Sequence, residues 1–175
     1  MQKFILVGAL ACSGLLAGCM GGMGSSGAER AEARLAPTQG NSVVGVVSFT
    51  QTGGKVRVVA EVSGLAAGAH GFHIHEKGDC SAPDGTSAGG HFNPGGKPHG
   101  NPEYAEHHAG DMPQLIANAA GVATLTAYLD GPTISEGATA IVGRSVIVHA
   151  APDDFKTQPT GNSGARQACG VIVRK

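Results

Sequence analysis

Histidines are the residues of this chain whose type and spacing could do chemistry. The sequence holds 8 histidines, and all but one lie between residues 70 and 108. His73 and His75 are separated only by Ile74. In a β-strand, side chains two positions apart point to the same face, so these two imidazoles would share one face while Ile74 packs behind them. Because neutral imidazole is a common ligand of copper and zinc, the pair predicts two metal ligands on one strand.

The candidate ligands outnumber what a single ion can use. A tetrahedral zinc site takes four nitrogen, oxygen or sulfur ligands. His91, His99, His108 and Asp111 fall in a segment without strand character and could form a second site there. Metal binding would then supply the order that this segment lacks. A pair of metal ions is the simpler interpretation, and a low-affinity, histidine-rich metal buffer is the alternative.

The elements that must position these ligands are short strands. Segments rich in β-branched and apolar residues alternate with turns, and no stretch after residue 41 keeps a helical period for three turns. This pattern, with 29 glycines and 9 prolines, predicts an all-β sandwich or barrel. We expect strands at residues 43–50, 55–62, 69–75, 115–117, 122–129, 141–142, 145–149 and 170–174. Residues 76–113 and 150–168 would form two long loops, and such loops are usually functional or disordered.

The N-terminal segment has the features of an export signal. Lys3 precedes an apolar run over residues 4–16 that is too short to span a bilayer comfortably. The run ends in Leu-Ala-Gly-Cys at residues 16–19, which resembles a bacterial lipoprotein signal and implies a lipid anchor on Cys19. An ordinary secretory signal with an incidental cysteine is the alternative. We therefore expect a signal peptide at 1–18, a flexible tether at 19–41 and one folded domain at 42–175.

Export bears on the remaining cysteines and on localisation. Once the signal is removed and Cys19 is lipidated, Cys80 and Cys169 remain. In an oxidising compartment they are most simply a disulfide, with a thiolate–metal site as the alternative. The formal net charge of −1 and the absence of tryptophan give no indication of nucleic-acid binding.

Several segments together resemble copper–zinc superoxide dismutase. They occur in order from about residue 43 to the C-terminus, and they read GFHIHE at 71–76, SAGGHFNP at 87–94, HAGD at 108–111, VH at 148–149 and GNSGARQACGVI at 161–172. The resemblance implies a Greek-key β-barrel, or flattened sandwich, with copper and zinc as cofactors. It also implies conversion of superoxide to dioxygen and hydrogen peroxide.

The resemblance assigns a role to individual residues. It implies copper ligands at His73, His75, His91 and His149, and zinc ligands at His91, His99, His108 and Asp111, with His91 bridging both ions. It pairs Cys80 with Cys169. Arg166 matches the cation that guides and holds the substrate anion, and Asp153 matches a carboxylate that hydrogen-bonds one ligand of each site. The H-x-G-D pattern selects His108 over its neighbour His107, although the spacing alone does not decide between them.

Other features remain open at this level. The lipoprotein-type signal and the tether are similar to the bacterial periplasmic branch of the family, which places the protein on the periplasmic side of a membrane. Homodimer formation is not decided, nor is the lysine among Lys77, Lys97 and Lys156 that steers the substrate. A non-catalytic, exported copper-binding domain on the same fold is the alternative function. Such a domain is expected to lack Arg166 or a copper ligand, and this chain has them all.

Overall fold

The computed structural model describes residues 1, 27–104 and 106–175. Cys19 and nearly all of the predicted signal peptide lie outside these residues. The described part holds one short 3-10 helix, η1 (Thr86–Ala88), and no helix in it is long and apolar enough to cross a bilayer. Its strands are β1 (Arg30–Pro37), β2 (Val44–Thr52), β3 (Lys55–Ser63), β4 (Gly68–His70), β5 (Phe72–His75), β6 (Leu115–Ala117), β7 (Ala123–Asp130), β8 (Ser145–His149) and β9 (Arg166–Arg174).

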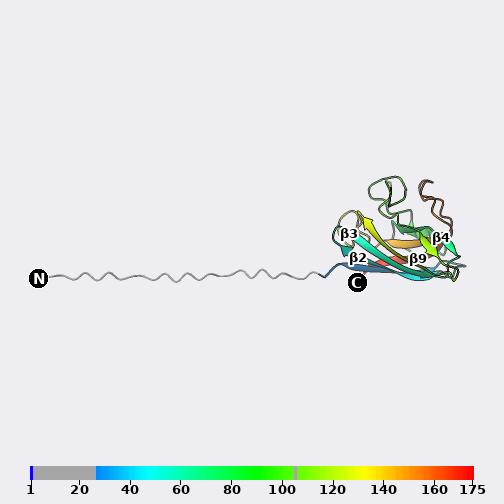
Figure 1. The fold of residues 1–175 in the computed structure, drawn as a ribbon, viewed down its shortest axis with the longest axis horizontal. Coiled ribbons are helices and arrows are strands. Elements are labelled where there is room, and N and C mark those ends of the chain that lie inside the picture. The colour runs from blue at the N-terminus through cyan, green and yellow to red at the C-terminus, as the bar shows by residue number, and fades with distance from the viewer. Residues whose placement is uncertain (2–26, 105) are drawn as a thin grey trace.

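The strands form a curled antiparallel sheet (Figure 1). Seven of them follow the spatial order β5-β8-β9-β1-β2-β3-β7, and β4 pairs with β6, which packs beside β7. β3 pairs with β7 rather than with β4, and β5 pairs with β8 rather than with β6. These skipped neighbours are the Greek-key pattern. The predicted all-β barrel is confirmed.

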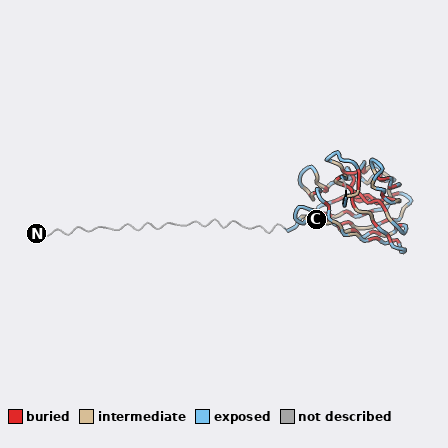
Figure 2. Tube along the Cα trace, turned by 45° about the horizontal axis from the view of Figure 1, so that its top comes forward, coloured by how far each residue is buried: buried red, intermediate tan, exposed pale blue. Residues whose placement is uncertain are grey.

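The core lies inside the curl and follows the two-residue period of the strands. In β3, Val56, Val58, Ala60 and Val62 are buried, and the residues between them face outward. Figure 2 shows this alternation of buried and exposed residues along the barrel. Because each fully buried aliphatic side chain contributes about 1.5–3 kcal/mol, the barrel is a firm support for the loops that it carries.

The predicted tether is wrong for part of its length. Residues 30–37 form β1, which pairs with β2 on one side and β9 on the other. Ala31, Ala33 and Leu35 are buried and alternate with outward-facing charged residues. Charged residues and alanines make up most of this segment, and alanine gives a weak strand signal. The folded domain therefore begins near residue 30 rather than at residue 42.

Two other strand predictions need correction. The predicted strand at 69–75 is split by Gly71, whose N–H donates to Ala151 O at 2.9 Å, so that β4 and β5 pair with different partners. Residues 141–142 are not a strand: their two N–H groups donate to Thr133 O and Ile134 O, each at 3.0 Å, and the pairing stops there.

The two long loops are present and rise from the same side of the barrel (Figure 1). Among the described residues of 76–113, η1 is the only regular element. The second loop, from residue 150, holds no strand until β9 begins at Arg166, which is four residues earlier than predicted. Isolated backbone hydrogen bonds, such as those of Ile74 N to Gly110 O and of Phe92 N to Ile74 O, each at 2.8 Å, and side-chain contacts therefore hold these loops in place.

Candidate metal centre

β5 and β8 supply the rigid part of the site. On β5, Ile74 is fully buried in the hydrophobic core, and His73 and His75 point to the opposite face. β5 pairs with β8 in the register Phe72↔Val148, which places His149 at the same end of the strand pair as His73. The strand geometry that the sequence predicts for the His-x-His pair is therefore the one observed.

Four imidazoles converge on one point. One ring nitrogen from each lies within 4.8 Å of the others, and the set is His73, His75, His91 and His149. The inward-facing nitrogens are His73 Nδ1 and the Nε2 atoms of the other three rings, and these buried atoms have no hydrogen-bond partner among the described residues. Buried polar atoms without partners are rare in folded proteins because each one costs free energy. This arrangement fits a bound metal ion.

The outward-facing nitrogens fix the tautomers of these rings. His73 Nε2 donates to Asp153 Oδ2 at 2.7 Å, His75 Nδ1 to Gly89 O at 2.9 Å, and His149 Nδ1 to Gly164 O at 3.2 Å. Each ring thus carries its hydrogen on the outside, and its lone pair faces the common point.

Burial keeps the four imidazoles neutral. It lowers the pKa of His91 to about 4 and that of His149 to about 3, despite smaller opposing contributions from hydrogen bonds. The pKa values of His73 and His75 are lowered for the same main reason. Because a metal binds the neutral imidazole, these ligands need not lose a proton to reach that state at neutral pH.

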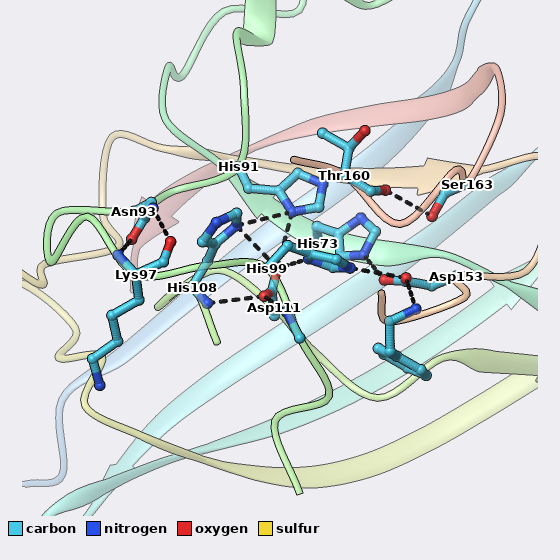
Figure 3. Close-up of polar contacts among 12 residues, drawn as sticks. His73, His91, Asn93, Lys97, His99, His108, Asp111, Asp153, Thr160 and Ser163 are labelled. Atoms are coloured by element: carbon cyan, nitrogen blue, oxygen red, sulfur yellow. Dashed lines mark hydrogen bonds and ion pairs between the residues drawn. The ribbon is translucent and has the colours of Figure 1, made fainter. Parts of the chain in front are cut away.

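A second group adjoins the first and contains His91, His99, His108 and Asp111 (Figure 3). Asp111 Oδ1 lies 2.9 Å from His91 Nδ1, 3.0 Å from His99 Nδ1 and 3.5 Å from His108 Nδ1. Tetrahedral ligands at zinc–nitrogen bond lengths stand about 3.3 Å apart. The four atoms are therefore spaced as the ligands of one zinc-sized ion would be.

The charges of the second group favour a cation. Burial alone would raise the pKa of Asp111, but hydrogen bonds from His108, His91 and His99 hold it well below its usual range. Burial would also lower the pKa of His99, and here the Asp111 and Asp153 carboxylates outweigh it and raise that pKa to about 9. The Asp111 carboxylate is thus ionised, and the raised pKa of His99 shows that the carboxylates around it stabilise positive charge at this place.

His91 belongs to both groups. Its Nε2 is one of the unpartnered nitrogens of the four-imidazole group, and its Nδ1 lies 3.4 Å from His108 Nδ1 in the second group. A ring that binds a cation through each nitrogen has lost both N–H protons, and two neighbouring dications favour that loss.

Asp153 belongs to neither group, and its carboxylate hydrogen-bonds one histidine of each. Its Oδ2 accepts a hydrogen bond from His73 at 2.7 Å, and its Oδ1 accepts one from His99 at 2.9 Å. Figure 3 shows the carboxylate beside the two rings. Gly161 makes this possible: its φ is +66°, and a Cβ there would lie 1.8 Å from Asp153 Oδ1 and 2.6 Å from His99 Nε2.

Arg166 and the disulfide lie beside the four-imidazole group. Cys80 and Cys169 are bonded, with their Cα atoms 5.7 Å apart, so the first loop is tied to β9. Arg166 donates from Nη1 to Gly85 O and from Nη2 to Gly89 O, each at 2.7 Å. Its guanidinium borders a cleft of about 360 Å³.

Of the two adjacent histidines, the structure brings His108 into the second group and leaves His107 outside it. Sequence reasoning missed two glutamines that dock the second loop. Gln158 Oε1 accepts from His99 N at 2.8 Å, and Gln114 Oε1 accepts from Asp153 N at 2.9 Å. Nothing in the sequence pattern marks these contacts, because they join residues 59 and 39 positions apart.

Fold and site together define an all-β protein in which two adjacent candidate metal sites share one histidine. Residues 43–172 match the family described as copper/zinc superoxide dismutase. With about three quarters of its length matched, this chain belongs to that family.

Individual relatives agree with this assignment. The chain is similar to an extracellular superoxide dismutase [Cu-Zn] of Caenorhabditis elegans, with 42% identity over 149 residues, covering 82% of this chain and 65% of the relative. It is also similar to superoxide dismutase [Cu-Zn] 2 of Brassica juncea, with 46% identity over 137 residues, covering 74% and 89%. The chain thus spans just under two thirds of the nematode protein. A crystal structure of the clock protein EA4 superposes with a TM-score of 0.74 at 39% identity, covering 82% of this chain and 93% of that one.

Proposed function

We propose that this protein dismutates superoxide, converting two superoxide anions and two protons to dioxygen and hydrogen peroxide. Membership of the copper/zinc superoxide dismutase family supports the reaction. The observation that carries the proposal is His91, because its two ring nitrogens face two different ligand groups. A protein that merely stored metal ions would have no need for a shared ring.

The four-imidazole group, His73, His75, His91 and His149, would hold copper. Imidazole suits both copper oxidation states, and copper, when bound, supplies the one-electron chemistry of both half-reactions. The group of His91, His99, His108 and Asp111 would hold zinc, because it offers a tetrahedral set with one carboxylate.

The protein's own residues bind the substrate and handle its protons. Arg166 stays charged at any relevant pH, and its side chain is held by Gly85 O and Gly89 O with donors to spare for an anion. His91 would hold a proton at Nε2 and give it to the reduced substrate. Asp153 keeps the tautomers of His73 and His99 fixed while this proton moves.

Metal analysis and spectroscopy test the proposal. Purified protein should contain close to one copper and one zinc per chain and should dismutate superoxide rapidly in stopped-flow assays. The electron paramagnetic resonance spectrum of its copper(II) form should show nitrogen coordination. His91→Ala should alter this spectrum and abolish turnover, whereas His107→Ala should preserve both. Full copper occupancy without turnover in the unaltered chain would favour the alternative, an exported copper-binding domain.

We further propose that the chain is exported and carries a lipid anchor on the periplasmic side of a bacterial membrane. The Cys80–Cys169 disulfide and the extracellular nematode relative support export. The Leu-Ala-Gly-Cys pattern at residues 16–19 supports lipidation of Cys19. Cys19→Ala should move the protein from the membrane fraction to the soluble periplasm. Membrane association that persists in this variant would exclude the anchor.

A further inference from the structure

The cleft beside Arg166 carries charges of both signs. Its lining includes one cation, Arg166, and one anion, Asp84. Gly164 also lines the cleft, and its carbonyl holds His149, so the cleft adjoins the four-imidazole group. Lys77, Lys97 and Lys156 are exposed, and none of them lines this cleft. A carboxylate thus lines the same cleft as Arg166, the residue proposed to hold the anionic substrate.

Local hydrogen bonds fix the position of Asp84. Its Oδ1 accepts from Thr86 N at 3.0 Å and from Thr86 Oγ1 at 2.6 Å. The next residue, Gly85, has φ +74°, and a Cβ there would lie 3.4 Å from Arg166 Cβ. Gly85 O also accepts a hydrogen bond from Arg166. The carboxylate is therefore anchored one residue away from a group that holds the guanidinium.

Asp84 is an anion at neutral pH. Its pKa is lowered, chiefly by the hydrogen bonds from Thr86 and to a smaller extent by Arg166. Its side chain is fully exposed, so water and salt screen its field. Repulsion of a second anion is then appreciable at low ionic strength and fades as the Debye length falls from about 30 Å at 0.01 M to about 8 Å at 0.15 M.

We propose that Asp84 sets the anion selectivity of the cleft beside Arg166. Its charge modestly slows the approach of superoxide to Arg166 and disfavours the binding of dianions there more strongly. The superoxide part of this inference rests on the proposed dismutase function. Coulomb energy is proportional to charge, so a factor that applies to a monoanion is squared for a dianion at the same position. With both charges in solvent, the expected factors at low ionic strength are about twofold and about fourfold.

Asp84→Asn isolates the charge, because asparagine keeps an Oδ1 acceptor for Thr86. The matched control is Asp79→Asn. Asp79 lies in the same loop and is fully exposed, and its Oδ1 accepts from Ser81 N at 2.8 Å in the same kind of turn. It does not line the cleft. Both variants change the net charge of the chain by the same amount.

Two measurements address the inference. The first is kcat/KM for superoxide with the fully metal-loaded enzyme at 10 and 150 mM ionic strength. The second uses zinc-loaded, copper-free protein: chloride binding is followed by the 35Cl line width, and sulfate is titrated in as a competitor at constant ionic strength. This second readout involves neither copper nor turnover.

Asp84→Asn is expected to raise kcat/KM about twofold at the lower ionic strength, with the gain lost at the higher one. Chloride affinity should rise about twofold and sulfate affinity about fourfold, with no change in Asp79→Asn. Equal gains in both variants, or equal gains for chloride and sulfate, would overturn the inference. If the unaltered enzyme lacks dismutase activity, the proposed function fails, and the chloride and sulfate titrations still decide the role of Asp84.

Discussion

Asp153 offers the sharpest test of how the two ligand groups are coupled. It is the acceptor for one imidazole of each group, with His73 at 2.7 Å and His99 at 2.9 Å. In Asp153→Asn the amide oxygen can accept from only one of the two rings, and the amide nitrogen confronts the other. One charge-assisted hydrogen bond is lost, and the other becomes a neutral one of about half the strength.

The expected loss follows from these two bonds. Hydrogen bonds to charged groups contribute about 1.5–3 kcal/mol and neutral ones about 0.5–1.5 kcal/mol. Replacing an outer partner of a metal-bound histidine typically reduces metal affinity by about 10- to 100-fold. Since Asp153 contacts a ligand in each group, Asp153→Asn should weaken both copper and zinc binding by about this factor.

Competition with chelators of known affinity measures both dissociation constants. Asp154→Asn is the matched control: it removes the same charge from the next residue, and the Asp154 carboxylate accepts hydrogen bonds from Lys156 and Thr157 rather than from a histidine of either group. The control should keep both affinities. The coupling would be refuted if Asp153→Asn weakened only one metal, or if both affinities stayed within about threefold of the unaltered protein.

Three further predictions follow from the same geometry. Arg166→Ala should lower kcat/KM for superoxide roughly tenfold and flatten its salt dependence, with partial recovery in Arg166→Lys; unchanged kinetics would remove its guiding role. Zinc must displace the proton that His99, with its pKa raised to about 9, carries at pH 7.5. Zinc uptake should therefore release close to one proton, whereas a histidine of ordinary pKa would release about a tenth of a proton. Zinc affinity should also fall as the pH falls below about 9. Calorimetry in buffers of different ionisation enthalpy measures both effects. Replacing Cys80 and Cys169 with serine should lower the unfolding free energy by about 4.6 kcal/mol in urea titrations, because their bond closes a loop of 89 residues; a loss under about 1 kcal/mol would contradict this.

The residues that the sequence predicts as ligands gather in two groups, whereas the sequence does not predict the strand that completes the sheet. The pair at His73 and His75 carries its geometry in its spacing, because a strand must place both rings on one face. β1 carries an equally regular alternation, but its buried positions are mostly alanines set among charged residues. Alanine gives a weak strand signal, so pairing with β2 and β9 rather than local propensity makes this segment a strand.

The contacts around the ligands were the least predictable part of the site. Gln158 and Gln114 join the second loop to His99 and to Asp153 by single amide contacts. Glutamine has no spacing signature that would reveal such a partner. Family resemblance locates Asp153, but only the three-dimensional structure shows that Gly161 must lack a side chain for Asp153 to approach His99.

None of the described residues of the second loop belongs to either group, yet this loop hydrogen-bonds histidines of both groups on their outward-facing side. Through Asp153 it contacts His73 and His99, and through Gln158 it holds the backbone of His99. The first loop carries the candidate ligands at residues 91–111, and it is tied to β5 by backbone hydrogen bonds and to β9 by the Cys80–Cys169 disulfide. Binding of a metal ion to His99 therefore stabilises the second loop as well as the first, since their contacts meet on the same ring.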